Sequence, residues 1–329
     1  MIDAADAADL LTLLASVPDP RRTPGRVHPT GYVLAVVLVA FTCPAFAHLV
    51  GAAAWAAAAP PWVLRLLGAK PDPLTRRVSP PSEATIRRVL TGVDPVAVQA
   101  VFTTWLTPRL GDATPEDDAL RGRSVDGKTL RGTRDATGRS DVMCHLLGVA
   151  THDHQVMLAQ VAVDGKTSEI DAVPTLLDQM HEAGQLNGQT VLTLDALHTI
   201  RESAQAIRDH GAHYLMTVKG NTPTLANAVI DRLRTTPAAH LGRHAQTDKG
   251  HGRTEHRLIT TAALTDVGSV HDEVTFPDAA QVARIVRHRG DLTGQRTTKE
   301  IVHVITSLPA TLADPAALAG LTRGHWSIW

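Results

Sequence analysis

The sequence has few cysteines, with only Cys43 and Cys144 among 329 residues. Two cysteines cannot build the disulfide framework of a small secreted domain, and their spacing does not match a zinc site. We therefore expect both to be buried, small apolar residues in a reducing compartment. Residues 1–6 are acidic and lack the basic segment that opens a signal peptide, so we expect a cytoplasmic protein.

The chain also lacks an excess of charge of either sign. It has 32 Lys and Arg residues and 33 Asp and Glu residues, which give a net charge of -1. Such a protein has no global positive field, so any binding of nucleic acid must come from local basic patches. Charged residues make up 20% and hydrophobic residues 43%, as in ordinary globular proteins. The length predicts two domains, or one elaborated domain, with ample material for a core.

Charge is absent from one long stretch, residues 31–59, and three arginines precede it. Its length and its positive flank leave a membrane span open as an alternative. Pro44 interrupts the stretch, and much of the second half is alanine. We therefore predict two buried helices, 32–41 and 45–58, broken at the proline, and no membrane partner.

Residues 1–110 carry helical patterns and predict a small all-helical domain. Ser82 is a good N-cap for a helix over 82–90. Arg87 and Arg88 on that helix fit the recognition element of a helix-turn-helix, but we favour a capped surface helix with solvated charges. A linker is predicted over 111–122, which begins with an acidic, proline-containing segment.

From residue 123 onward, short runs of Val, Leu and Thr alternate with helical patterns, as in a mixed α/β domain. The predicted strands are 123–126, 142–151, 156–163, 190–194, 213–218, 254–261, 281–289 and 301–307. The predicted helices are 168–180, 200–210, 222–233 and one that starts near 314. The order β-β-β-α-β-α-β-α is that of an RNase H-like fold, in which two adjacent strands bring separate carboxylates together.

The most informative stretch, residues 124–133, reads Ser-Val-Asp-Gly-Lys-Thr-Leu-Arg-Gly-Thr. A short apolar run leads Asp126 to a glycine turn, and a carboxylate at a strand end can bind a divalent cation. Lys128 and Arg131 follow at once and can contact phosphate oxygens. Gly127 lets the backbone come close to such a ligand.

Two further aspartates bear on this site. The pattern Val-Asp-Gly-Lys-Thr recurs at 163–167, so Asp164 competes with Asp126, and Asp-Gly is a common turn dipeptide. The β-run 190–195 ends in Asp195, and open α/β sheets bind ligands at such strand ends. Asp126 and Asp195 would form half of a two-metal site for displacement at a phosphate. The competing interpretation of Asp195 is an N-cap, and the two roles can coexist.

Other candidates for phosphate contact follow later strands. Lys219 would face the same sheet edge as Asp195; the alternative is a solvated lysine before a helix that Asn221 caps. Residues 249–257 mix cations with glycines and form either a phosphate-binding hairpin or a loop that enters a strand. The His-Asp-His run at 152–154 suggests zinc, but adjacent residues point to opposite faces, so we predict a polar turn.

Seven short motifs also occur in a fixed order along the chain. They are 126–132, 166–170, 193–196, 214–221, 251–255, 307–308 and 323–328. This ordered set resembles the DDE transposases of bacterial insertion sequences, in the ISAs/H-repeat-associated branch. The helical N-terminal part resembles the domain that usually precedes their catalytic domain.

The resemblance implies an RNase H-like catalytic domain over 123–329 that binds Mg²⁺ (or Mn²⁺) and cuts and joins DNA. Asp126 and Asp195 match the first two carboxylates of the catalytic triad and would be the catalytic and metal-binding residues. Together with the local chemistry, the motifs assign DNA or phosphate contacts to Lys128, Arg131, Lys219, Asn221, His251, Arg253 and Arg323. The expected partner is DNA at the terminal repeats of the element, bound by a homodimer, without a small-molecule cofactor.

The chain departs from the family pattern at the third carboxylate. The glutamate of the pattern Arg-x-x-x-x-x-Glu, counted from Arg323, falls on Trp329. Glu300 leads into a predicted strand, and we do not expect it to substitute. A missing carboxylate leaves the transition-state charge less neutralised. We therefore expect a transposase truncated at its last helix and impaired in strand transfer; the alternative is a DNA-binding remnant or repressor without catalysis.

Overall fold

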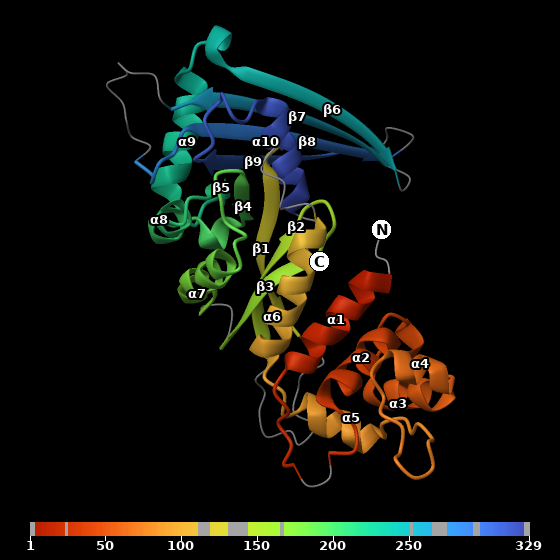
Figure 1. Cartoon of the computed structure of the whole chain (residues 1–329). Helices are drawn as coiled ribbons and strands as arrows, with labels where there is room; N and C mark the ends of the chain where they lie inside the picture. Colours follow the sequence, from red (N-terminus) through yellow and green to blue (C-terminus); the bar gives the residue numbers. More distant parts are fainter. Residues whose placement is uncertain are drawn as a thin grey trace. The chain divides into compact units, whose positions relative to one another are not determined.

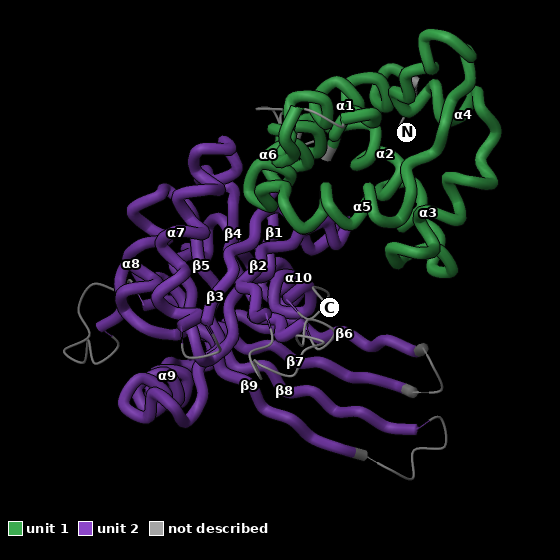
Figure 2. The backbone as a smooth tube through the Cα atoms, turned by 90° about the horizontal axis from the view of Figure 1, so that it is seen from below, with its two compact units in different colours: residues 1–114 green, residues 115–329 purple. Residues whose placement is uncertain are grey.

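The computed structural model describes residues 4–23, 26–110, 119–130, 144–164, 168–250, 253–264, 275–291 and 297–325. The chain divides into two compact units, residues 1–114 and residues 115–329, which Figure 2 shows in different colours. The described part of the first unit contains helices and no strand, whereas the second unit carries a large sheet (Figure 1).

The first unit is organised around α2, which covers much of the uncharged stretch and is buried on almost every side. Val33 and Val36 are fully covered, which is the pattern of a helix inside a globular core. The elements are α1 (Ala4–Ser16), α2 (Thr30–Phe41), η1 (Pro44–Phe46), α3 (Leu49–Ala58), α4 (Pro61–Leu66), α5 (Glu83–Leu90), α6 (Pro95–Leu106) and η2 (Thr107–Leu110).

The predicted break at Pro44 is confirmed, because this proline begins the short 3-10 helix η1 between α2 and α3. The predicted burial of Cys43 is wrong, because this residue lies at the start of η1 and is exposed. Helix α3 begins later than predicted, at Leu49, since Nδ1 of His48 accepts the N–H of Gly51 at 3.0 Å and caps it. Among the described residues no single helix is long and apolar enough to cross a membrane. The bent pair α5 and α6 together has the length and the composition of a membrane span, and nothing else in this part of the chain indicates one.

Helix α5 has the cap and the charge pattern of a surface helix. The Ser82 hydroxyl accepts the N–H of Thr85 at 3.3 Å, as its N-cap position predicts. The guanidinium of Arg87 pairs with Glu83 one turn earlier, and Nε of Arg88 donates to the carbonyl of Ala84. Both arginines are therefore engaged within their own helix, while Ile86 and Val89 are buried in the core.

The described part of the second unit forms a mixed sheet with the strand order β3-β2-β1-β4-β5-β9-β8-β7-β6 (Figure 1). Strands β1 to β3 form an antiparallel meander, and β4 and β5 run parallel to β1. This is the RNase H-like arrangement that the order of elements predicts. The strands are β1 (Arg121–Thr129), β2 (His145–Thr151), β3 (Met157–Val163), β4 (Thr190–Leu194), β5 (His213–Val218), β6 (Gly242–Gly250), β7 (Arg253–Ala263), β8 (Gln281–Asp291) and β9 (Thr297–Thr306).

Helices cover both faces of the central strands. On one face α7 (Glu169–Glu182), α8 (Arg201–Asp209) and α9 (Pro223–Thr235) share a core with Val125 and Leu192. On the other face α10 (Pro315–Gly324) packs on Val191 and Leu215. All five side chains of β4 are buried, as expected for a parallel strand covered on both sides.

The structure departs from the predicted strands in two places. The sequence analysis missed β6, which pairs with β7 at the edge of the sheet. Its sequence, Gly-Arg-His-Ala-Gln-Thr-Asp-Lys-Gly, has almost no apolar side chain, which suits an edge strand that water covers on one side. Strand β1 does not end in a turn at Gly127, because its pairing with β2 continues to Thr129, opposite His145.

Candidate active site

Asp126 and Asp195 lie just beyond the last residue pair of the ladder between β1 and β4. Val125 is paired with Leu194, and on each of these parallel strands the next residue is an aspartate. Both aspartates are partly buried. The topology therefore brings together two carboxylates that are 69 positions apart in the chain, from 126 to 195.

The end of α10 docks beside this pair. The Ser124 hydroxyl donates to the carbonyl of Gly324 at 3.2 Å, so Ser124 faces α10. Side chains alternate along a strand, and Asp126 therefore lies on the same face as Ser124. The hydroxyl of Thr193 is 3.1 Å from Nδ1 of His325, the residue that follows α10. The motif that begins at Arg323 thus reaches the two strands that carry the aspartates.

Asp195 is held by the turn that it begins. It occupies the N-cap position of the 3-10 helix η5 (Ala196–His198), and its Oδ1 accepts the N–H of Leu197 at 2.9 Å. Nδ2 of Asn221 donates to the carbonyl of Ala196 at 2.6 Å. The hydroxyl of Thr199, at 2.6 Å from the carbonyl of Thr217, ties the turn to β5. The N-cap role and the place at a strand end coexist.

The alternative in which Asn221 caps the following helix is wrong in this detail. Helix α9 has Thr222 at its N-cap position, without a side-chain cap, and Pro223 at its first position. The amide of Asn221 is instead used by the turn after Asp195. The residue that sequence analysis assigned to phosphate contact therefore also supports the backbone of the site.

Thr193 is the centre of a hydrogen-bond cluster behind the aspartates. Its hydroxyl lies 3.3 Å from the carbonyl of Arg123, 3.1 Å from Nδ1 of His325 and 3.0 Å from Nε2 of His152. A carbonyl only accepts, so the single hydroxyl proton goes to Arg123 and both imidazoles donate to the hydroxyl. This assigns the N–H to Nδ1 of His325 and to Nε2 of His152.

Burial keeps both imidazoles neutral near pH 7. Burial lowers the pKa of His152 to about 4, and a charge on the neighbouring His325 would lower it further. Burial also lowers the pKa of His325, although the charges of Asp126 and Asp195 act in the opposite direction. The His325 ring is therefore within electrostatic reach of both carboxylates.

The sequence analysis missed the role of His152. The run 152–154 is a turn, as predicted, but the His152 ring is largely buried and packs against Gly324. A β-carbon on Gly324 would lie under 3.0 Å from the ring, so only glycine allows this close approach of α10. No local pattern marks such a histidine, because its contacts come from distant elements.

A second missed group is a buried carboxylate with two histidines. Glu169, at the start of α7, is 3% exposed. Its Oε1 is 2.6 Å from Nε2 of His145, and its Oε2 is 3.1 Å from Nε2 of His198. A β-carbon on Gly127 would collide with this carboxylate, so the glycine makes room for Glu169 rather than for an approaching ligand. Glu169 belongs to one of the ordered motifs, which was the available signal.

Three of the residues predicted to contact phosphate lie on or directly after β1, β5 and α10, the elements next to the aspartates. Lys128 is exposed and lies two residues beyond Asp126, on the same strand face. Lys219 is exposed immediately after β5, the neighbour of β4. Arg323, on α10, is half-exposed and lies 3.3 Å from Asp248. Arg131, His251 and the side chain of Arg253 lie outside the described residues.

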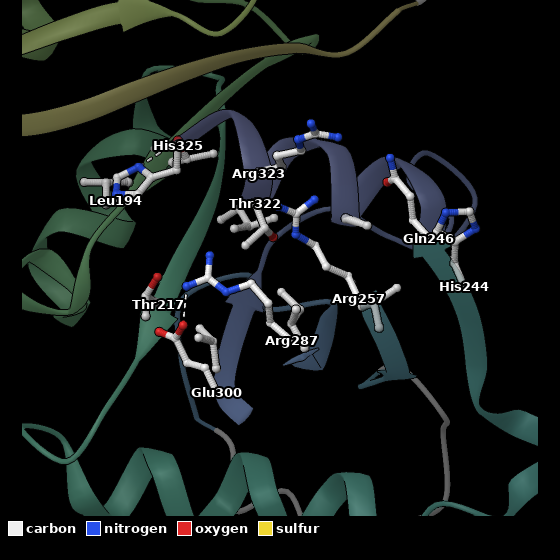
Figure 3. Close-up of a pocket in the computed structure, with 16 residues that line it drawn as sticks. Leu194, Thr217, His244, Gln246, Arg257, Arg287, Glu300, Thr322, Arg323 and His325 are labelled. Atoms are coloured by element: carbon white, nitrogen blue, oxygen red, sulfur yellow. Dashed lines mark hydrogen bonds and ion pairs between the residues drawn. The ribbon is translucent and has the colours of Figure 1, made fainter. Parts of the chain in front are cut away.

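A pocket of about 130 Å³ opens next to this site, between α10 and the face of β4 to β9 (Figure 3). His325 stands at one end, and Arg257, Arg287 and Arg323 are among the other residues that line it (Figure 3). Arg287 pairs with Glu300 across neighbouring strands. Arg257 pairs with Asp248 and Glu255, and Arg323 also lies near Asp248, so carboxylates balance the arginines of this pocket.

The rival carboxylates lie elsewhere. Asp164 follows β3, which is three strand spacings from β4, about 14 Å. Glu300 is within β9, with β5 between it and β4, and its carboxylate pairs with Arg287. Neither residue lies at the end of the ladder between β1 and β4, where Asp126 and Asp195 lie.

The side chains at this site can be compared with the ligands that a divalent cation requires. In the part of the chain that the structure describes, no group of three or more His, Cys, Asp or Glu side chains is arranged to hold a metal ion. Mg²⁺ in phosphoryl-transfer sites is commonly bound by one or two carboxylates, with water and substrate phosphates completing the shell. Asp126 and Asp195 fit that chemistry as the protein's share of the ligands.

Family profiles match most of the chain. Residues 11–106 match the family described as "DDE_Tnp_1-associated", and residues 118–328 match "Transposase DDE domain". The first match covers the helical unit and the second covers the sheet with its aspartates.

Relatives at about 30% identity span much of the sequence. An "Uncharacterized protein in dhlA 3'region" of Xanthobacter autotrophicus is 30% identical over 295 residues, 85% of this chain and 88% of that protein. The Escherichia coli K12 protein "H repeat-associated putative transposase YhhI" is 29% identical over 257 residues, 75% of this chain and 63% of that protein. Among solved structures, a piggyBac transposase synaptic complex with hairpin DNA aligns with a TM-score of 0.40 at 9% identity, covering 100% of this chain and 67% of that chain.

Proposed function

The chain belongs to the family of DDE transposases, in its H-repeat-associated branch, and from this we propose that Asp126 and Asp195 form a site for metal-dependent cleavage and transfer of DNA strands. The observation that carries the proposal is the pairing of Val125 with Leu194, which places one aspartate directly after each residue of the pair. DNA would be bound at the terminal repeats of an insertion element, in the cytoplasm and by a dimer.

Asp126 and Asp195 would hold Mg²⁺ or Mn²⁺ through their carboxylate oxygens. The bound metal would supply positive charge to the attacking and leaving oxygens of a phosphodiester. The turn after Asp195 orients its carboxylate, because Oδ1 is fixed by the N–H of Leu197. The neutral His325 ring closes the site on the side of α10 and adds no charge that would repel the cation.

Basic side chains would bind the DNA backbone around this centre. Lys128 and Lys219 lie on β1 and after β5, one on each side of the strand that leads to Asp195. Arg323 on α10 lines the same pocket as Arg257 and Arg287 (Figure 3), and DNA phosphates would compete for these arginines with the carboxylates that pair with them. Local cations of this kind can bind phosphates although the chain as a whole has a net charge of -1.

A second candidate function is DNA binding without strand transfer. The observation in its favour is Trp329, which stands where the family resemblance places the third carboxylate and lies outside the described residues. With two carboxylates the transition-state charge is less well neutralised, so we propose that strand transfer by this chain is impaired. Such a chain would still recognise element ends and would act as a repressor of an intact copy.

The two functions are separated by strand cleavage on DNA that carries terminal repeats, with Mg²⁺ or Mn²⁺. The variants are Asp126→Ala and Asp195→Ala, with Asp231→Ala as the matched control on the exposed face of α9. A transposase loses all cleavage in the first two variants, keeps it in the control and retains DNA affinity in all three. Turnover equal to that of a relative with the third carboxylate, lost on Asp195→Ala, would refute the impairment. Cleavage that survives both variants would refute the site.

A further inference from the structure

The carboxylate of Glu169 is buried and accepts hydrogen bonds from two histidines on different elements. Its own exposed fraction is 3%, and those of His145 and His198 are 5% and 0%. The distances of 2.6 and 3.1 Å are those of hydrogen bonds in which each Nε2–H donates to one carboxylate oxygen. A buried charge of this kind requires such partners, because an unpaired carboxylate would be strongly destabilising.

The His145 arm reaches β1. His145 begins β2, opposite Thr129, and its Nδ1 is 2.7 Å from the Thr129 hydroxyl. Since Nε2 of His145 donates to Glu169, Nδ1 accepts the hydroxyl proton of Thr129. Glu169 is thereby connected to the segment of β1 that begins with Asp126.

The His198 arm reaches the turn after β4. His198 is the last residue of η5, the 3-10 helix that Asp195 caps. Nε2 of His198 donates to Glu169, while its buried Nδ1 has no hydrogen-bond partner among the described residues. The position of this ring therefore depends on Glu169 more than on any other polar contact that the structure describes.

Glu169 contacts the sheet from the face opposite to Asp126. Val125 belongs to the core that includes α7, and by alternation Gly127 points to that face while Asp126 points to the face of α10. The Glu169 carboxylate fills the space next to Gly127. It therefore cannot share a cation with Asp126, and its effect on the site must pass through the two backbone segments.

We propose that Glu169, with His145 and His198, is a clamp that fixes the separation of Asp126 and Asp195 from behind the sheet. Glu169 is a positioning residue in this role, and it touches neither substrate nor metal. The ladder between β1 and β4 ends at Val125 and Leu194, so beyond it the clamp bridges the two strands. An effect of Glu169 on metal binding rests on the proposed function. The mechanical tie between residues 126–129 and residues 196–199 does not rest on it.

Amide hydrogen exchange of the full chain tests whether Glu169 holds residues 126–129 and residues 196–199 together. The variant is Glu169→Gln, and the matched control is Glu182→Gln at the exposed far end of the same helix. The tie joins the two segments only while both bonds are present, and a glutamine can accept from only one of the two imidazoles, because its amide nitrogen donates. We expect exchange at least about 10-fold faster in both residues 126–129 and residues 196–199, with α10 unchanged and the control equal to wild type.

One further variant tests the His145 side of the clamp separately from the His198 side. Thr129→Val removes only the side-chain hydrogen bond between His145 and β1 and leaves the pairing of β1 with β2 intact, so exchange should rise in 126–129 and stay unchanged in 196–199. Unchanged exchange in Glu169→Gln, a rise in only one of its two segments, or an equal rise in Glu182→Gln would overturn the clamp. A uniform rise over the whole second unit would also overturn it, because it would mean general destabilisation.

Titration with Mn²⁺ tests the consequence at the site. Groups that orient metal ligands typically change metal affinity 10- to 100-fold, and Glu169 acts through backbone, so we expect about 10-fold weaker binding in Glu169→Gln. Unaltered Mn²⁺ affinity in this variant would overturn the positioning role. If wild type binds no Mn²⁺, the proposed function fails while the exchange result still decides the mechanical tie. If wild type binds Mn²⁺ and both readouts are unchanged in the variant, the clamp fails alone.

Discussion

Replacing Gly127 by alanine is the smallest change that should disturb the site. A β-carbon at this position would lie closer than 3.0 Å to three atoms of the Glu169 carboxylate, a separation that real β-carbons essentially never show. Glu169 is buried and held by two imidazoles, so it cannot turn away into solvent. The added methyl group must therefore displace the carboxylate or separate α7 from β1.

The cost follows from the bonds that would be lost. A hydrogen bond to a charged group contributes about 1.5–3 kcal/mol, so losing both bonds of Glu169 would reduce the free energy of unfolding by about 3–6 kcal/mol. That is a large part of the about 5–15 kcal/mol that stabilises an ordinary domain. Gly127 lies within β1, where the extended backbone itself accepts alanine. The expected loss therefore comes from the contact with Glu169.

A double-mutant cycle measured by urea unfolding isolates this contact. Gly127→Ala should lose about 3–6 kcal/mol in the wild-type background. In the Glu169→Ala background the methyl group meets no carboxylate, and alanine restricts the unfolded chain, so the same change should be neutral or stabilising by up to about 1 kcal/mol. An equal cost in the two backgrounds, or a loss below about 1 kcal/mol in wild type, would refute the steric reasoning.

Three other outcomes are expected. The pKa of His152 is about 4 in the fold and near 6.5 in the unfolded chain, so the unfolded chain binds the proton more strongly. His152 alone should therefore lower the free energy of unfolding by about 3 kcal/mol between pH 7 and pH 4. In urea titrations over that range, His152→Gln should remove this part of the decline, and an unchanged slope would contradict it. Asn221→Ala should lose about 1 kcal/mol with its bond to Ala196 and weaken Mn²⁺ binding; unchanged affinity would show that this bond does not support the site. Lys219→Ala should reduce by about 1 the slope of log affinity for duplex DNA against log salt, and an equal slope would exclude a phosphate contact.

Local patterns predicted the elements that carry strong periodicity or strong caps. The strands at 190–194 and 213–218 agree with β4 and β5, and the break at Pro44 is confirmed. The RNase H-like order of strands is confirmed as well. The polar edge strand β6 was missed, because its stability comes from pairing with β7 rather than from its own apolar residues.

The site was only partly predictable for a related reason. The pairing of β1 with β4 turns two strand-end aspartates into neighbours, and strand-end carboxylates are visible in sequence. The contacts around them are not, because Glu169, His152 and His198 acquire their partners from elements far away in the chain. The resemblance to a family did mark 166–170, which contains Glu169, but it gave no role to that residue.

The central claim is that Asp126 and Asp195 together bind a divalent cation. The most direct test is anomalous diffraction from crystals of the full chain soaked with Mn²⁺, compared with crystals of the Asp195→Asn variant. The account predicts an anomalous peak bound by carboxylate oxygens of both aspartates, absent or much weaker in the variant. A peak at Asp164 or elsewhere, with none at this pair, would contradict it.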